Sequence, residues 1–444
     1  MKSKCLLLVL SLALLLIVTT TAEAQFDNIR NVYFDTLVTG DVAATPIGVG
    51  DMSYIGTDYI TQSDSTLMAY ATAVVRNDID FYADFELVFV DSFYLKTYEI
   101  SELDVLGWQR LGATYLLRLE AEFPAENMRV RWRLWDVAGR QQFARGTLAR
   151  PKEQWRELGH DIANDVVYNL TGDPGIFLTQ IVYAKQNAKG KELFLSDYDG
   201  ANERQLTNNG SINLSPSFSP LGNEVFFVSY KDGDPSLFVI NLENNHLTKV
   251  ASFEGSIVAA PAVSPDGRQI ACVLSKDGNS EIYALRTDGK IIKRLTYHRS
   301  IDTSPTWSPD SRRIAFASDR SGAPQVYIMD ADGLNTVRLT YKGSYNDSPI
   351  WSDRGDRITF VTRTKLGRFD LASIDTSGTD FRVLTEVGHN ENPHFSPDGK
   401  HIIFTSTDRI TPHPELFTMD ITGRNQRRLT RSQGTSSPDW GPLR

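Results

Sequence analysis

The chain is poor in cysteine, with only Cys5 and Cys272, and Cys5 lies in an apolar segment at the N-terminus. One cysteine beyond that segment cannot form a disulfide within the chain, so packing and hydrogen bonds must hold the fold. Cys272 stands in the strand-like stretch QIACVLS. That setting indicates a small buried core residue rather than a reactive thiol.

Long apolar runs are also missing, apart from Cys5–Val18. This run follows two lysines and precedes Ala22–Ala24, which is the pattern of a secretory signal peptide cleaved after Ala24. It is too short to span a membrane comfortably. We therefore expect an exported mature chain that begins at Gln25 and has no direct membrane span.

An excess of positive charge is absent, because the formal net charge is −9 for the whole chain. Removal of residues 1–24, which carry two lysines and one glutamate, makes it −10. This acidity argues against nucleic acid or an anionic lipid surface as the partner. The sequence also has no G-x-S-x-G and no glycine-rich phosphate loop, which argues against a serine hydrolase and a nucleotide-binding enzyme.

What the chain does have is one short phrase repeated six times. It reads SPSFSPLG, APAVSPDG, SPTWSPDS, SPIWSDRG, NPHFSPDG and SPDWGP. The copies start at Ser215, Ala260, Ser304, Ser348, Asn392 and Ser437, so the spacing is 44 or 45 residues throughout. A period in the forties built from short strand patterns is the signature of a β-propeller blade.

Each repeat contains four strand patterns. In the repeat from Ser304, the phrase is followed by RIAFAS, QVYIMD and VRLT, with turn residues between them. The array lacks a phrase strand before QIVYAK at Gln180, and it ends on a lone phrase strand at Ser437–Trp440. Pairing these two ends gives six complete blades and closes the ring, which removes exposed sheet edges.

The segment before the repeats has a different pattern. Strand patterns at Arg30–Val38, Pro46–Val49, Phe85–Val90, Thr114–Phe123 and Met128–Val137 alternate with helical patterns, which favours a small α/β domain. The helical patterns are Leu67–Arg76, Leu103–Arg110 and a final helix from about Lys152 to Leu170.

The final helix places Trp155, Leu158, Ile162, Val166 and Leu170 on one apolar face. It stops at Gly172, with a proline two residues later. We therefore expect a signal peptide at 1–24, an N-terminal α/β domain at 25–170, a linker at 171–175 and a propeller at 176–444. The short linker and the apolar helix suggest that the two domains dock against each other.

This order of signal peptide, small α/β domain, helix and six-bladed propeller resembles the TolB family of the Tol-Pal system in Gram-negative envelopes. Three stretches carry the resemblance: TPIGVGDM at Thr45, the junction from Glu157 to Gln186, and the repeated phrases. Together they cover nearly the whole mature chain. The phrases alone also occur in peptidase and lyase propellers, so the junction is the specific part. Residues 53–111 carry no clear match.

The resemblance implies a non-enzymatic periplasmic binding protein without cofactors or metal. It implies that a Pal-like peptidoglycan-associated lipoprotein binds the propeller face where loops lead into the phrase strands. It also implies that the mature N-terminus, Gln25–Arg30, engages a TolA-like inner-membrane protein. The role implied is support of outer-membrane integrity and of constriction at division.

The candidate partner-binding residues lie at and just before the phrases. The residue that lies two positions before each phrase should ring the channel mouth. There these residues could hydrogen-bond a partner or, with Asp347 and Glu391, hold a cation. Equally, they could cap strand ends. The full candidate set is Asn213, Ser215, Ala260, Asp302, Thr303, Ser304, Asn346, Asp347, Ser348, Asn390, Glu391, Asn392, Thr435 and Ser437. The aromatic or aliphatic residue inside each phrase is expected to be core.

A second class of function, a carbohydrate-active propeller enzyme resembling metal-dependent lyases, rests on three histidines. His389, His394 and His413 lie in or beside the sixth blade. No carboxylate accompanies them at ligand spacing, so the metal signal is weak. An enzyme needs convergent histidine, arginine or carboxylate groups deep in the channel, whereas a docking protein needs a polar rim.

Overall fold

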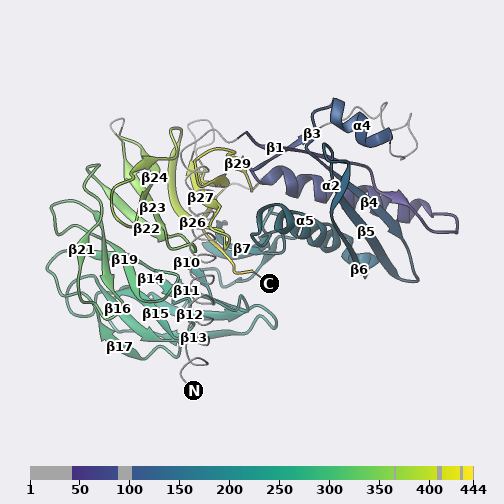
Figure 1. Cartoon of the computed structure of the whole chain (residues 1–444). Coiled ribbons are helices and arrows are strands. Elements are labelled where there is room, and N and C mark those ends of the chain that lie inside the picture. The colour runs from purple at the N-terminus through teal and green to yellow at the C-terminus, as the bar shows by residue number, and fades with distance from the viewer. Residues whose placement is uncertain (1–42, 89–102, 365–366, 408–412, 431–433, 444) are drawn as a thin grey trace, which may run out of the picture.

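The structure, a computed structural model, describes residues 43–88, 103–364, 367–407, 413–430 and 434–443. It contains a mixed α/β part followed by a ring of six four-stranded sheets, which confirms the predicted fold class (Figure 1). The predicted signal peptide, the mature N-terminus and the strand pattern Arg30–Val38 lie outside the described residues.

The N-terminal part is built on one mixed sheet. Its strands are β1 (Thr45–Val49), β2 (Ser53–Tyr54), β3 (Phe85–Val88), β4 (Tyr115–Glu122), β5 (Asn127–Asp136) and β6 (Gln141–Pro151). Their order is β3-β1-β4-β5-β6, with β2 also paired to β4. Strand β1 runs parallel to β3 and β4, whereas β4, β5 and β6 form an antiparallel meander.

Two helices, α2 (Gln62–Phe81) and α5 (Trp155–Thr171), pack against each other and cover one face of this sheet. In α5 the predicted apolar face is confirmed, because Leu158, Ile162 and Val166 are fully buried. The helix ends at Gly172, which has a φ of 77° and donates its N–H to the Tyr168 carbonyl at 2.8 Å. A left-handed residue at this position is a helix stop that glycine adopts without strain.

The end residues of some other helices and strands differ from the predictions, because sequence patterns do not locate the ends of an element to the residue. A 3₁₀ turn, η1 (Lys152–Gln154), precedes α5, and α2 extends beyond the predicted Leu67–Arg76 at both ends. Helix α4 (Leu103–Arg110) has the predicted bounds. Strand β3 includes Phe85–Val88, and the last two residues of the predicted strand lie outside the described residues.

Each propeller blade is a four-stranded antiparallel sheet. Blade 1 contains β30 (Thr435–Trp440), β7 (Gln180–Gln186), β8 (Lys191–Asp197) and β9 (Arg204–Gln205). Blade 2 contains β10 (Asn213–Phe218), β11 (Glu224–Ser229), β12 (Ser236–Asn241) and β13 (Leu247–Ala251). Blade 3 contains β14 (Val258–Val263), β15 (Gln269–Leu274), β16 (Glu281–Arg286) and β17 (Ile291–Arg294).

The other three blades repeat this order. Blade 4 contains β18 (Asp302–Trp307), β19 (Arg313–Ser318), β20 (Gln325–Asp330) and β21 (Val337–Arg338). Blade 5 contains β22 (Asn346–Trp351), β23 (Arg357–Arg363), β24 (Phe369–Asp375) and β25 (Arg382–Val383). Blade 6 contains β26 (His389–Phe395), β27 (His401–Thr407), β28 (Glu415–Asp420) and β29 (Arg427–Arg428).

The two faces of the propeller carry different loops. One face holds the turns that join first to second and third to fourth strands, and the N-terminal part packs on it; we call it the covered face. Tyr82 donates a hydrogen bond to Asp398 there at 2.7 Å, and Asn425 donates one to the carbonyl of Phe81. The opposite face, which we call the free face, holds the loops that lead into each inner strand and those between second and third strands.

Candidate partner-binding face

The inner strand of every blade carries the same β-bulge. In blade 4, Thr303 pairs with Ala317 and Thr306 pairs with Ala315, so Ser304 and Pro305 add one residue to the inner strand. The residue at the first phrase position has a φ between 46° and 52° in all six copies, Ser215, Ala260, Ser304, Ser348, Asn392 and Ser437. The proline that follows lacks an N–H, so the bulge leaves no donor unpaired there. This geometry explains why the phrase recurs.

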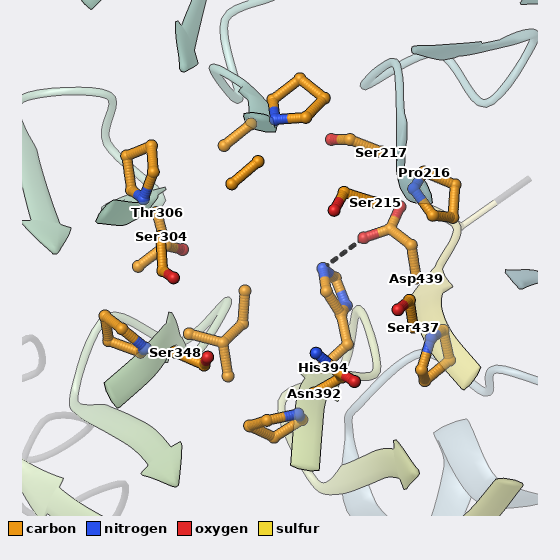
Figure 2. Close-up of a pocket in the computed structure, with 18 residues that line it drawn as sticks. Ser215, Pro216, Ser217, Ser304, Thr306, Ser348, Asn392, His394, Ser437 and Asp439 are labelled. Carbon is orange, nitrogen blue, oxygen red and sulfur yellow. Dashed lines mark ion pairs between the residues drawn. The ribbon is translucent and has the colours of Figure 1, made fainter. Parts of the chain in front are cut away.

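The six bulges surround one axial cavity of about 190 Å³. Figure 2 shows that the labelled side chains at the first and third phrase positions gather around this cavity, and that they come from different blades. The first positions supply serine hydroxyls in four blades and an amide from Asn392 in a fifth. The third positions vary, and two of them, His394 and Asp439, carry the cavity's charged groups.

His394 and Asp439 form an ion pair across the junction of blades 6 and 1. The distance from Nε2 to Oδ1 is 2.6 Å, and the His394 side chain is a quarter exposed. Burial opposes protonation of the ring, but the Asp439 carboxylate outweighs it and raises the pKa of His394 to about 9. The other oxygen of Asp439 accepts the backbone N–H of Phe218 in blade 2 at 2.7 Å. One carboxylate therefore joins three consecutive blades.

The His394 pair should make the stability of the propeller depend on pH. The pKa of His394 rises from 6.5 to about 9 on folding, so the stabilisation is complete below pH 6.5 and is lost as the pH rises to 9. We expect a loss of about 3 kcal/mol over that range, measured by urea unfolding at several pH values. His394→Gln should flatten this part of the profile, and His389→Gln, at an exposed ring, should not. An unchanged slope in His394→Gln would contradict the pairing.

The polar residues two positions before the phrases do not line the channel mouth, which corrects the prediction for them. Asn213, Asp302, Asn346, Asn390 and Thr435 are all at most 1% exposed. Their side chains point back into the blades, where each finds a hydrogen-bond partner. They cap and hold the loops of the free face, which was the alternative that the sequence left open.

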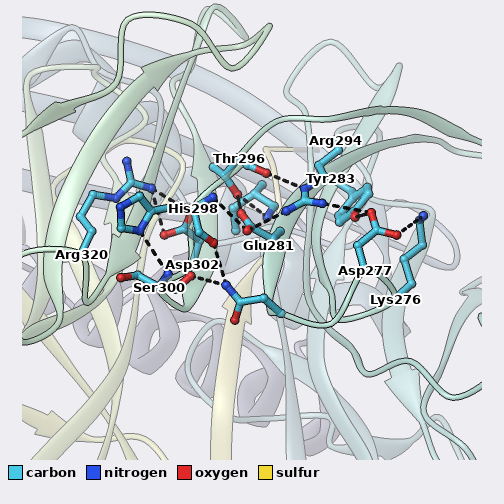
Figure 3. A network of polar contacts seen from close by, with 12 residues as sticks. Lys276, Asp277, Glu281, Tyr283, Arg294, Thr296, His298, Ser300, Asp302 and Arg320 are labelled. Carbon is cyan, nitrogen blue, oxygen red and sulfur yellow. Dashed lines mark hydrogen bonds and ion pairs between the residues drawn. The ribbon is translucent and has the colours of Figure 1, made fainter.

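Figure 3 shows this arrangement where blade 3 leads into blade 4. The buried Glu281 accepts hydrogen bonds from the Thr296 hydroxyl at 2.6 Å and from the backbone N–H of His298 at 3.0 Å, and it pairs with Arg294. Arg320 binds both carboxylate oxygens of Asp302, at 3.0 and 2.9 Å. The network therefore fixes the loop from β17 to β18, and it is structural rather than available to a partner.

The same device explains the Leu-Thr pair that follows the outer strand in every blade except blade 2. The threonine hydroxyl bonds a polar side chain from the start of the third strand, as in Thr207 to Glu192 and Thr340 to Gln325. It also accepts a backbone N–H from that strand, for example from Leu193 at 2.9 Å. Buried polar groups of this kind must be paired, so the threonine recurs with its partner.

The remaining candidate residues are accessible to different degrees. Glu391 is exposed, and eight others are partly exposed: Ser215, Ala260, Thr303, Ser304, Asp347, Ser348, Asn392 and Ser437. Asp347 accepts hydrogen bonds from the Tyr345 hydroxyl and from the backbone N–H of Ser348, so its oxygens are already engaged. The accessible part of the predicted site is therefore the bulge ring and its immediate rim.

Sequence reasoning missed an apolar arc on the free face. Ile212, Ile257 and Ile301 precede the inner strands of three consecutive blades and are 46%, 52% and 50% exposed. Tyr297 and Tyr341, which lie in the loops leading into β18 and β22, are more exposed still. The signal was available, because an isoleucine stands directly before the inner strand in three repeats, in a loop where no core requires it.

The histidines that suggested a metal do not converge. His389 and His413 are exposed, and His394 is paired with Asp439. Among the residues that the structure describes, no three His, Cys, Asp or Glu side chains are grouped so that they could hold a metal ion. Within the same residues, no helix is long and apolar enough to cross a membrane.

Comparison with known proteins gives consistent matches along the chain. A family model described as the TolB beta propeller domain matches residues 167–444, and one described as the TolB amino-terminal domain matches residues 36–143. A Tol-Pal system protein TolB from Paramagnetospirillum magneticum is 36% identical over 151 residues, which are 33% of this chain and 34% of the relative. The alignment therefore spans about a third of the length of that curated relative.

A solved structure extends the similarity over most of the molecule. The crystal structure of TolB from Acinetobacter baumannii superposes with a TM-score of 0.78 at 25% sequence identity. The superposition covers 90% of this chain and 97% of the other. Both the α/β part and the propeller are therefore shared.

Proposed function

This chain belongs to the TolB family, and on that premise we propose that it is a protein-binding component of a Tol-Pal-like system in a Gram-negative envelope. TolB proteins are typically periplasmic and are not enzymes, so we set aside the carbohydrate-active alternative. The observation that carries the proposal is the match of both family models in this domain order. The proposed role is to support outer-membrane integrity and constriction during division.

We propose that the free face of the propeller binds a Pal-like peptidoglycan-associated lipoprotein. The described N-terminal part occupies the opposite face, and no other described part of the chain packs on the free face. The bulge ring offers hydroxyl and amide groups, and the arc of Ile212, Ile257 and Ile301 offers exposed apolar surface beside it. Exposed apolar side chains next to polar groups are the usual components of a protein interface.

We further propose that residues 1–24 are a cleaved signal peptide and that Gln25–Arg30 engages a TolA-like inner-membrane protein. Both segments lie outside the described residues. Chain termini commonly take part in contacts outside their own domain. The mature chain would then contact its two partners through separate parts, one at the N-terminus and one on the propeller.

Titration calorimetry of the mature chain with the Pal-like and TolA-like proteins of the same bacterium tests both contacts. Ile257→Ser with Ile301→Ser should weaken Pal binding by at least about tenfold, since a few large side chains that become buried carry most of the energy of an interface. Leu221→Ser with Leu334→Ser, at exposed positions of the covered face, is the matched control and should leave it unchanged. Deletion of Gln25–Arg30 should remove only TolA binding. Equal Pal affinity in both double variants would place the interface elsewhere.

A further inference from the structure

The N-terminal sheet has a second face that α2 and α5 do not cover. In Figure 1, α5 lies between the propeller and strands β4, β5 and β6, so this second face is turned away from the propeller. Helix α4 covers only one end of it, where Trp108 packs with Leu116 and Trp135. The rest presents the alternate residues Arg118, Glu120 and Glu122 of β4, Arg129, Arg131 and Arg133 of β5, and Arg145, Thr147 and Ala149 of β6.

This surface, which we call the arginine face, is basic in an acidic protein. It carries five arginines against two glutamates, whereas the whole chain has a formal net charge of −9. Arg133 stands directly opposite Arg118 on one side and Arg145 on the other. Like charges directly opposite each other in a sheet repel, so a further acidic group beside this row would stabilise it.

The two glutamates of β4 pair with the arginines of β5, and neither of them pairs with Arg145 of β6. Glu122 pairs with Arg129 at 2.9 Å and with Arg131 at 3.4 Å, and Glu120 pairs with Arg133 at 2.9 Å. The three β5 side chains remain 37% to 46% exposed. On the other side, β6 contributes Arg145, Thr147 and Ala149 and no acidic residue. The residues of this face that lie on β5 and β6 therefore carry net positive charge, and those on β4 carry net negative charge.

Strand β6 is also the last strand of the sheet. It is eleven residues long, and no described residue pairs with its outer edge. Its only proline is Pro151, at the end, so the rest can accept a further strand. A long exposed edge normally attracts another extended chain through its unpaired N–H and carbonyl groups.

We propose that the arginine face and the outer edge of β6 together bind an acidic polypeptide segment, which adds to the sheet as a strand beside β6. Strands β4 and β5 already contain the type of contact that we propose, because the alternate glutamates of β4 form ion pairs with the arginines of β5. A segment with acidic residues at every second position would place its carboxylates on the same face beside Arg145, where guanidinium and carboxylate match in shape. A phosphate-bearing lipid surface would meet the charge but leave the backbone groups of β6 unpaired.

The probe is a fluorescein-labelled ten-residue peptide of alternating glutamate and threonine, titrated with the mature chain in 50 mM NaCl and followed by fluorescence anisotropy. We expect saturable binding that weakens steeply with salt. Arg145→Glu should weaken it by at least about tenfold, because a charge-assisted contact becomes a repulsion. Lys290→Glu, an equal charge change at an exposed propeller site, should leave it unchanged, and Thr147→Arg should strengthen it.

Two further arms test strand addition and the class of partner. The same glutamate-threonine peptide with every backbone nitrogen methylated has the same charge but no N–H donor for the edge of β6, so it should bind at least about tenfold more weakly. Amide hydrogen exchange should show peptide-dependent protection within Gln141–Pro151. Equal binding of the two peptides, protection only in the propeller, or binding to phosphatidylglycerol vesicles without binding to the peptide would each overturn the proposal. The melting temperature of Arg145→Glu should match that of the parent chain, which would show that the variant is folded and that its loss of binding is not caused by unfolding.

Discussion

A chain that ends at Thr435 is expected to lose at least about 10 °C of melting temperature, or to fail to fold. The deletion removes the pairs Asp439 to Val182 and Trp440 to Ile181, and with them the inner strand of blade 1. Trp440 is 4% exposed, and its indole N–H donates to the Thr179 hydroxyl at 2.8 Å. Loss of a buried tryptophan alone costs about 3–5 kcal/mol, and about 1 kcal/mol corresponds to 2–4 °C in a domain of this size.

Opening the ring adds to that loss. Without β30, strand β7 becomes an exposed edge, and the blade 6 side of the junction loses its contact with blade 1. Removal of residues 443–444 alone is the control, because it leaves β30 intact and should change the melting temperature by less than about 2 °C. Calorimetry of both truncations decides the matter: equal melting temperatures for the long deletion and the parent chain would contradict closure through β30.

The repeated phrase predicted the blades because its chemistry is local. A proline after a left-handed residue, followed by a large apolar side chain, specifies a bulge and a core contact within four residues. Six copies at an even spacing then leave few alternatives to a closed ring. The phrase does not reveal which way its neighbours point. The bulge turns Ser304 toward the axis and leaves Asp302 inside the blade, an arrangement that depends on the three-dimensional path of the strand.

Strand β6 was missed for a different reason. Its sequence QQFARGTLARP alternates weakly, and no residue in it is fully buried. An edge strand packs on one side only, so it does not need the strong apolar alternation by which inner strands are recognised. The arginine face could not be predicted from the sequence either. It depends on the register of three strands and not on any run of charge along the chain.

The domain junction could be located from the sequence, but its contacts could not. Asp78, near the end of α2, is fully buried and accepts hydrogen bonds from the Tyr198 hydroxyl at 2.5 Å and from His160 Nδ1 at 2.7 Å. Tyr198 belongs to the turn after β8, and His160 belongs to α5. One carboxylate thus joins two helices of the N-terminal part to blade 1. Such a link between residues 120 positions apart leaves no pattern along the chain.

Asp78→Ala is therefore expected to lower the free energy of unfolding by about 3–5 kcal/mol, because removing one member of a buried charged network leaves the others unpartnered. Asp78→Asn keeps an acceptor for the Tyr198 hydroxyl and should cost less. The matched control is Asp80→Ala, two residues further on the same helix, where the carboxylate is 43% exposed and pairs with Arg427 at 2.9 Å. A pair that exposed contributes about 1 kcal/mol or less. Denaturant unfolding of the three variants tests the ranking, and equal losses for Asp78→Ala and Asp80→Ala would show that the buried cluster does not hold the domains together.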